Sequence, residues 1–217
     1  MFKNKILLPL FILTGVILLG WYFAFYKKPL FTVMKVPHFS FVDQNNITVS
    51  DETMLGKVYL VEFFFSTCPT ICPVMNSNMK KIQDEIHSPN FGIVSISIDP
   101  KNDTSEVLLQ HAQKIGAGNN WHFLTGDRKV IGEVADQFNI YVGNKEDEAQ
   151  NLNHSGMIAL VDEKGYIRCR LDAKGKPKLY YSGLNYLDAE GKNSSLTGKY
   201  HPDVDALIED IKILLKL

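Results

Sequence analysis

Two cysteines, Cys68 and Cys72, stand four residues apart directly after a run of strand-forming residues. Pro73 follows the second cysteine, and a proline, which lacks an N–H, fits the first turn of a helix. We therefore expect the thiols where a buried strand ends and a helix begins. Cys72 is expected at or beside the N-cap, where the helix dipole and the free amides favour thiolate. Such a pair can bind a soft metal ion or form a reversible disulfide.

The sulfur ligands favour copper(I) over harder ions. Copper(I) accepts low coordination numbers, so two thiolates and one imidazole would suit it, whereas magnesium and calcium prefer oxygen ligands. Two sulfurs alone leave such a site incomplete, so a third ligand must come from elsewhere. With three cysteines in 217 residues, the chain has too few for a disulfide-stapled scaffold. The third, Cys169, alternates with apolar neighbours and is interpreted as packing.

The elements that position the thiols can be predicted from the apolar pattern. Val58–Phe65 is apolar except for Glu62, as expected of a strand that is covered on both faces. Phe91–Ile98 is a second such strand, and apolar residues recur at helical spacing between the two. This order predicts a βαβ unit with parallel strands. Met75 and Met79 lie on the apolar side of the helix and are interpreted as core, not as copper ligands.

Beyond this unit, short strands and helices continue to alternate. A βαβ half followed by a ββα half around a central mixed sheet is the thioredoxin-like arrangement, so the predicted fold class is α/β. The other predicted elements are hairpins over residues 39–49 and 157–171, a strand over Trp121–Leu124, and helices over Thr104–Ile115, over Asp127–Phe138 and from Pro202 onward.

The N-terminus predicts a membrane anchor. Residues 6–26 carry no charge, and at about 1.5 Å per residue they can cross a hydrocarbon core of roughly 30 Å. A cleaved signal peptide is the rival interpretation, but the run is long for one and its aromatic end lacks a small-residue cleavage site. We expect an uncleaved transmembrane helix within residues 1–26, a linker at 27–36 and one domain at 37–217. Lysines flank both ends of the run, so they do not fix the orientation.

The charge balance of the rest of the chain disfavours nucleic acid as a partner. Residues 1–35 hold five lysines and no acidic residue, which leaves 18 basic and 24 acidic residues, a net charge of −6, for the remainder. A nucleic-acid-binding domain would instead carry a basic surface. The length of this remainder fits one domain with a sizeable core.

Four segments of the chain carry a specific pattern: Cys68–Pro73, Ser97–Thr104, Trp121–Gly126 and His154–Asp162. Together they resemble the SCO/SenC family, copper proteins that help to assemble cytochrome c oxidase. The resemblance runs over most of residues 37–171. One C-x-x-x-C-P motif would be weak evidence, whereas four segments in the family's order are specific. The resemblance fades between about residues 172 and 201, and nothing is carried over there.

The resemblance implies one copper ion per chain, held by Cys68, Cys72 and His154. His154 precedes the predicted strand Met157–Val161, about where thioredoxin-type oxidoreductases place a cis-proline that faces the cysteines. No proline occurs between Pro100 and Pro177. This absence favours a ligand set over a general thiol–disulfide exchanger.

Several residues near these segments keep two interpretations. Asp99 and Asp103 would either support the copper ligands and contact a partner, or serve turn and helix-capping chemistry. Glu62 would be paired in its buried strand or line the site. Val142–Asn153 is a polar stretch that predicts a solvated loop leading to His154. The remaining histidines are interpreted as structural: His38, His87, His111, His122 and His201.

The expected function is that of a membrane-anchored copper metallochaperone, not strictly an enzyme. It would deliver copper or reducing equivalents to the binuclear copper site of a terminal cytochrome c oxidase. Its expected partners are the copper-bearing oxidase subunit or another copper chaperone, with the domain on the extracytoplasmic, periplasmic side of the cell membrane. The alternative is a metal-independent thiol–disulfide oxidoreductase that uses Cys68 and Cys72. A thiol peroxidase ranks third, because Thr67 precedes Cys68 without the nearby proline that peroxiredoxins have.

Overall fold

The protein folds around one mixed β-sheet with the strand order β1-β8-β7-β4-β5-β6-β2-β3, and β9 also pairs with β7. The computed structural model describes residues 14–21, 29–69, 71–140, 142, 156–172, 174–184 and 203–217. The strands are β1 (Phe31–Lys35), β2 (Ser40–Asp43), β3 (Thr48–Ser50), β4 (Val58–Phe64), β5 (Phe91–Ser97), β6 (Trp121–Thr125), β7 (Met157–Val161), β8 (Tyr166–Cys169) and β9 (Tyr181–Ser182).

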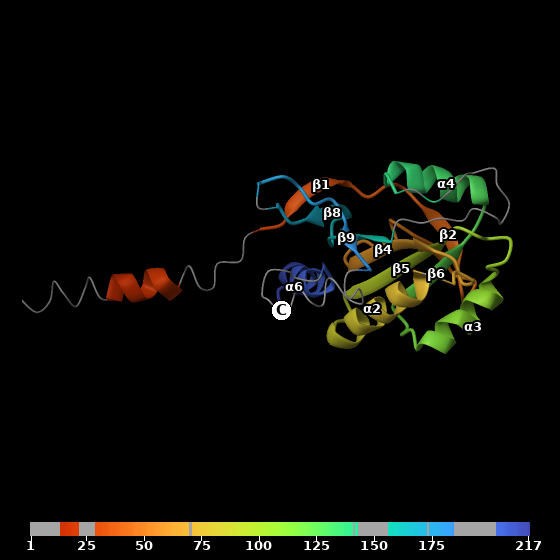
Figure 1. Cartoon of the computed structure of the whole chain (residues 1–217), viewed down its shortest axis with the longest axis horizontal. Helices are drawn as coiled ribbons and strands as arrows, with labels where there is room; N and C mark the ends of the chain where they lie inside the picture. The colour runs from red at the N-terminus through yellow and green to blue at the C-terminus, as the bar shows by residue number, and fades with distance from the viewer. Residues whose placement is uncertain are drawn as a thin grey trace, which may run out of the picture.

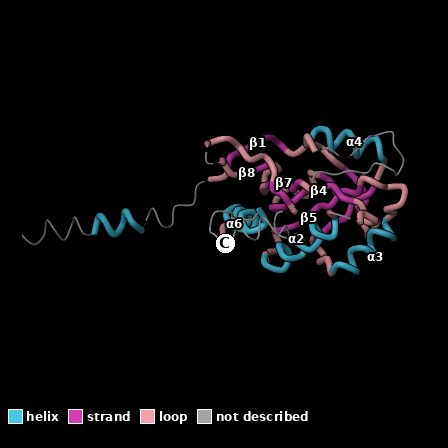
Figure 2. The backbone as a smooth tube through the Cα atoms, in the orientation of Figure 1, coloured by secondary structure: helices cyan, strands magenta, loops and turns pink. Residues whose placement is uncertain are grey.

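The centre of the sheet confirms the predicted βαβ unit. β4 and β5 run parallel, with Glu62 opposite Ser95, and β6 continues the parallel part. β7 lies antiparallel on the other side of β4, with Glu62 opposite Ile158. Every residue of β4 and β5 is buried, because helices cover both faces of these strands (Figure 2).

Helices lie on both sides of the sheet. α2 (Cys72–Glu85), α3 (Ser105–Ile115) and α6 (Asp203–Leu215) lie on one side, and α4 (Arg128–Gln137) lies on the other (Figure 1). Ion pairs join α6 to α2, from Lys81 to Asp205 and from Lys212 to Glu85. Layers of helices around a mixed sheet confirm the predicted α/β class.

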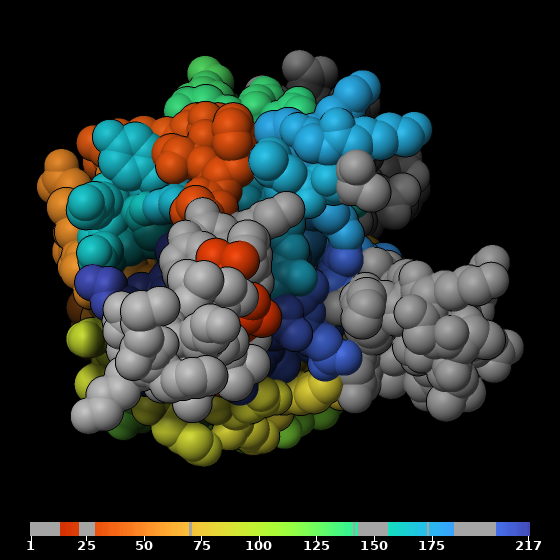
Figure 3. Space-filling view, turned by 90° about the vertical axis from the view of Figure 1, so that its left-hand side faces the viewer, coloured from red at the N-terminus to blue at the C-terminus, as the bar shows by residue number. Residues whose placement is uncertain are grey.

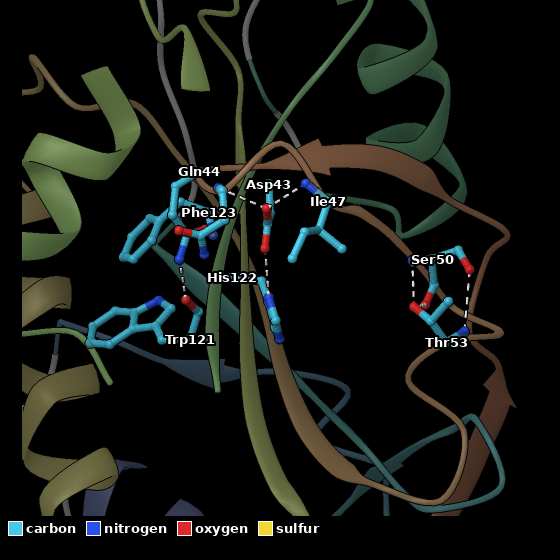
Figure 4. Close-up of polar contacts among 9 residues, drawn as sticks. Asp43, Gln44, Ile47, Ser50, Thr53, Trp121, His122 and Phe123 are labelled. Atoms are coloured by element: carbon cyan, nitrogen blue, oxygen red, sulfur yellow. Dashed lines mark hydrogen bonds and ion pairs between the residues drawn. The ribbon is translucent and has the colours of Figure 1, made fainter. Parts of the chain in front are cut away.

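A polar cluster fixes the β2–β3 hairpin to β6 (Figure 4). The Gln44 side chain donates to the carbonyl of Trp121 and accepts from the N–H of Phe123, each at 2.8 Å. The Asp43 carboxylate lies 3.1 Å from Nδ1 of His122 and also accepts two backbone N–H groups of its own turn. His122 is therefore structural, as predicted.

The sheet extends further toward the N-terminus than the sequence indicated. Residues 27–36 were expected to form a linker, but β1 pairs with β8, so that Phe31 lies opposite Cys169. β1, β8 and the segment after β8 lie together at the end where the chain enters the domain (Figure 3). Most of the expected anchor lies outside the described residues, although residues 14–21 are helical. Within the described parts of the chain, no helix has the length and apolar character needed to span a bilayer.

Candidate metal centre

Cys68 lies in the short loop that joins β4 to α2, and Cys72 lies where this loop ends. The helix begins at Cys72, with Ile71 as the N-cap and Pro73 in the first turn, as the sequence predicts. Both cysteines are thiols, not a disulfide. Their exposed fractions are 7% for Cys68 and 2% for Cys72, so the fold shields both sulfurs from bulk water.

The two thiols lie close enough to influence each other, and Cys72 is held in its protonated form. Burial raises the pKa of Cys72 well above its ordinary value. A backbone hydrogen bond with Phe65 opposes this shift, whereas the Cys68 thiol and the Glu62 carboxyl add to it. The expectation that the helix N-terminus favours thiolate is therefore wrong for the metal-free protein, because desolvation outweighs it. A metal ion that binds this sulfur must displace its proton.

Asp103 fixes the cysteine loop to the end of β5. Its buried carboxylate accepts hydrogen bonds from the N–H of Ser66 at 3.0 Å and from the Ser97 hydroxyl at 2.5 Å, and a third from the Ser66 hydroxyl. The Asp99 carboxylate instead accepts from Asn102 at 2.8 Å, within the same turn. Of the two open interpretations, Asp103 therefore supports the cysteine loop from behind, and Asp99 serves turn chemistry.

Glu62 lies in β4 behind the same loop and is part of a buried chain of hydrogen bonds. The indole of Trp121 donates to the Ser95 hydroxyl at 2.9 Å, which donates to Oε1 of Glu62 at 2.7 Å. Oε2 of Glu62 is buried without a hydrogen bond in the described structure. Burial raises the pKa of this carboxyl to about 7. Glu62 is thus paired, as one interpretation predicted, and it also acts electrostatically on Cys72.

A cleft of about 440 Å³ opens beside the thiols, between α2 and α3. Sequence reasoning placed His111 among the structural histidines, yet it lines this cleft together with both cysteines. The sequence signal that could have placed His111 here is helical spacing, because His111 falls between Leu108 and Ala112 on the buried side of α3. The lining residues are Ser66, Cys68, Cys72, Pro73, Asn76, Ser77, Lys80, His111, Lys114 and Ile115.

His154 and residues 143–153 of the predicted loop lie outside the described residues. The chain is described again from Gly156, whose carbonyl accepts from the N–H of Gly183 at 2.8 Å. The carbonyl of Gly183 accepts a hydrogen bond from Asn78 of α2. Because β7 runs antiparallel to β4, it starts at the edge of the sheet where β4 ends and the cysteine loop begins. Within the described residues, no group of three or more His, Cys, Asp or Glu side chains could hold a metal ion.

Three other sulfur atoms take the structural roles that the sequence predicts. Met75 and Met79 point into the core from α2, and Cys169 is buried in β8; none is exposed by more than 1%. None of the three lines the cleft. The thiols that the described structure brings to one place are therefore Cys68 and Cys72.

Comparison with curated proteins finds relatives over the middle of the chain. The SCO1 protein homolog of Bacillus subtilis is 36% identical over 138 residues, which are 61% of this chain and 71% of that protein. A protein of Stutzerimonas stutzeri described as a putative copper-binding protein is 29% identical over 143 residues, 64% of this chain and 69% of its own. The matched part covers 64–66% of the length of several rickettsial SCO2-like proteins.

Solved structures share the fold over most of the chain. A SCO1/SenC family lipoprotein from Bacillus anthracis has a TM-score of 0.68 at 24% identity and covers 88% of this chain and 99% of its own. BsSco is a member of the Sco family of cytochrome c oxidase assembly proteins in which a disulfide switch was identified. Its TM-score is 0.63 at 26% identity, and the alignment covers 88% of this chain and 98% of BsSco. Copper-bound yeast Sco1 has a TM-score of 0.55 at 20% identity, and the alignment covers 78% of this chain and 92% of the yeast chain.

The family model described as SCO1/SenC matches residues 28–187, which include β1, the cysteine loop and β9. The match covers more than half of the chain, and the relatives and solved structures agree with it. The chain therefore belongs to the SCO1/SenC family.

Proposed function

We propose that the protein is a membrane-anchored copper metallochaperone that delivers copper, reducing equivalents or both to the binuclear copper site of a terminal cytochrome c oxidase. One observation carries the proposal: two buried thiols share one cleft at the start of α2, and no other described thiol lies there. Soft sulfur donors suit copper(I). Membership of a family whose members include a copper-bound protein and oxidase assembly proteins supports the same function.

Copper is the cargo in this proposal, one ion per chain, with Cys68, Cys72 and His154 as ligands. The two thiols lie in the described structure, and His154 precedes Gly156, which connects through Gly183 to α2. Asp103 would hold the cysteine loop in place, since it receives two hydrogen bonds from Ser66 in that loop and one from Ser97 at the end of β5. The deprotonated sulfurs would bind the ion, and their protons would be released to solvent.

Copper titration of the reduced protein tests this ligand set. We expect the wild type to bind one copper(I), and Cys68→Ser and Cys72→Ser to lose nearly all binding. His154→Ala should bind copper(I) more weakly and should unfold at the same temperature as the wild type. His87→Ala is a matched control, because His87 is exposed and does not line the cleft. Unchanged stoichiometry and affinity in all three ligand variants would overturn the proposal.

A second candidate is a metal-independent thiol–disulfide oxidoreductase. The neighbouring Cys68 and Cys72 thiols favour it, as they are close enough to interact, and a disulfide switch was identified in the related BsSco. Both functions use the same sulfurs, so cysteine variants do not separate them. A variant without His154 does, because it keeps both thiols.

Anchoring at the membrane belongs to the proposal as well. Residues 6–26 would remain as a single transmembrane helix, with the folded domain on the extracytoplasmic side of the cell membrane. We expect mass spectrometry of the native protein, extracted from membranes, to find these residues intact. A mature N-terminus beyond Tyr26 would contradict the anchor and favour a cleaved signal peptide.

A further inference from the structure

A hairpin follows β8 directly, at the end of the domain where β1 begins (Figure 3). We call residues 170–172 and 174–179 the lysine hairpin, and Lys174 and Lys176 its tip lysines. An antiparallel bridge joins the two arms. At the tip, the Asp172 carboxylate accepts hydrogen bonds from the backbone N–H groups of both tip lysines, each at 2.8 Å. These contacts hold the hairpin in a defined shape.

The charges of the lysine hairpin are compensated at its base but not at its tip. Ion pairs join the base to α6, from Arg170 to Asp210 at 2.7 Å and from Lys178 to Asp203. The tip lysines are exposed and take part in no ion pair among the described residues. Residues 164–180 hold six basic residues and one acidic residue, although the chain after residue 35 has a net charge of −6. The tip therefore presents positive charge that is free to attract an anionic surface.

Exposed apolar side chains lie beside the tip lysines. Leu171 and Leu179, one on each arm of the hairpin, are 52% and 39% exposed. Phe31 of β1 pairs with the last residue of β8 and is 43% exposed. A single exposed apolar residue needs no explanation, but these three lie on neighbouring segments at one end of the sheet. Apolar side chains next to lysines suit the boundary between the headgroups and the acyl chains of a bilayer.

The position of this end in the chain brings it close to the proposed anchor. The side chains of residues 16–19 and of Trp21 are 59–66% exposed, so the described domain leaves them uncovered. The proposed anchor ends at Tyr26, five residues before Phe31. At about 3.6 Å per residue, five residues span no more than about 18 Å. The bilayer is therefore within reach of the lysine hairpin, whereas α3 and α4 lie at the far end of the domain (Figure 1).

We propose that the lysine hairpin and Phe31 dock the domain onto the membrane that holds its anchor. The tip lysines would contact the phosphate groups of anionic phospholipids, and the three apolar side chains would enter the headgroup layer. The inference rests on the membrane anchor in the proposed function. Docked in this way, the domain would keep α3, which lines the cleft beside the thiols, in the aqueous phase.

A tryptophan in the lysine hairpin can report its contact with lipid. Leu171→Trp is introduced into the full chain, which is incorporated into vesicles of phosphatidylglycerol or of phosphatidylcholine with brominated acyl chains. Bromine quenches tryptophan fluorescence on contact, and the emission of the wild type, from Trp21 and Trp121, is subtracted. We expect most of the added emission to be lost in phosphatidylglycerol, which is anionic, and most of it to remain in phosphatidylcholine.

A control tryptophan at the far end of the domain shows that the quenching is local. Val130→Trp on α4 replaces a side chain that is 44% exposed, close to the value for Leu171. Its added emission should remain in both lipids.

Neutral variants test the role of charge in the Leu171→Trp background. Lys174→Gln combined with Lys176→Gln should restore most of the emission in phosphatidylglycerol. We expect the ratio of docked to undocked domain to fall about thirtyfold, which corresponds to about 1 kcal/mol for each lysine near an anionic surface. Lys114→Gln combined with Lys129→Gln changes the net charge equally, at exposed positions on α3 and α4, and should leave the quenching unchanged. Thermal unfolding shows that each variant is folded.

Flotation with phosphatidylcholine vesicles reports the anchor separately, because these vesicles carry no net charge. A chain that does not float with them would refute the anchor and the docking together. If the chain floats, equal emission from Leu171→Trp in the two lipids, or quenching that survives neutralisation of the tip lysines, would overturn the docking alone. Blue-shifted emission without quenching would overturn it as well, since a protein surface, such as a second copy of this chain, would then cover the hairpin.

Discussion

At the scale of single residues, Glu62 is a carboxyl buried in the central strand behind two thiols. One of its oxygens accepts from Ser95, and the other has no hydrogen bond within the described structure. Because burial disfavours the charged form, the pKa of Glu62 rises from 4.5 to about 7. The folded protein therefore holds this proton over a pH range in which the unfolded chain has released it.

Glu62 should consequently make the protein less stable as the pH rises. Below pH 4.5 the carboxyl is protonated in both states, and between pH 4.5 and about 7 the unfolded chain releases the proton first. The free energy of unfolding should fall over this range by about 3 kcal/mol and then level off. Glu62→Gln should abolish this fall in the free energy of unfolding. Urea unfolding of both proteins at pH 5 and pH 8 measures it, and an equal pH dependence in the two would contradict the assignment.

At the scale of elements, the sequence predicts the central strands and the helix after the cysteines, because continuous burial leaves a clear apolar pattern. β1 was missed because it is an edge strand with four of its five residues exposed, so its pattern resembles a linker. β9 has only two residues. The cleft could not be predicted, since it depends on α2 and α3 lying side by side. His111 and Asn76 meet there across 35 residues of sequence.

The loop between β4 and α2 should depend on Asp103 for its position. Asp103→Asn replaces one acceptor oxygen by an NH2 group, so the side chain can no longer accept from the Ser66 N–H, the Ser66 hydroxyl and the Ser97 hydroxyl together. We expect a loss of about 2 kcal/mol in the free energy of unfolding and weaker copper binding with unchanged stoichiometry. Asp99→Asn is the control, because it keeps an oxygen for Asn102. Chemical denaturation measures the free energy of unfolding, and copper titration measures the affinity. If Asp103→Asn matches the control in both quantities, Asp103 does not fix the position of the loop.

At the scale of the whole molecule, one pair of sulfurs would serve two chemistries. Thiolate ligation of copper and disulfide formation exclude each other at any instant, because each uses the sulfurs of Cys68 and Cys72. On the oxidising side of a membrane the pair would tend toward the disulfide. Reduction would then precede copper loading.

The most direct test of the copper function is the activity of the terminal oxidase in cells. A strain without this protein should lose oxidase activity, and added copper should restore part of it. The wild-type gene should restore it fully, whereas stably expressed His154→Ala, which keeps both thiols, should not. Failure of this variant is the predicted result, because a copper ligand is missing while disulfide chemistry remains available. Full restoration by His154→Ala would contradict the copper function and favour a metal-independent thiol reductase.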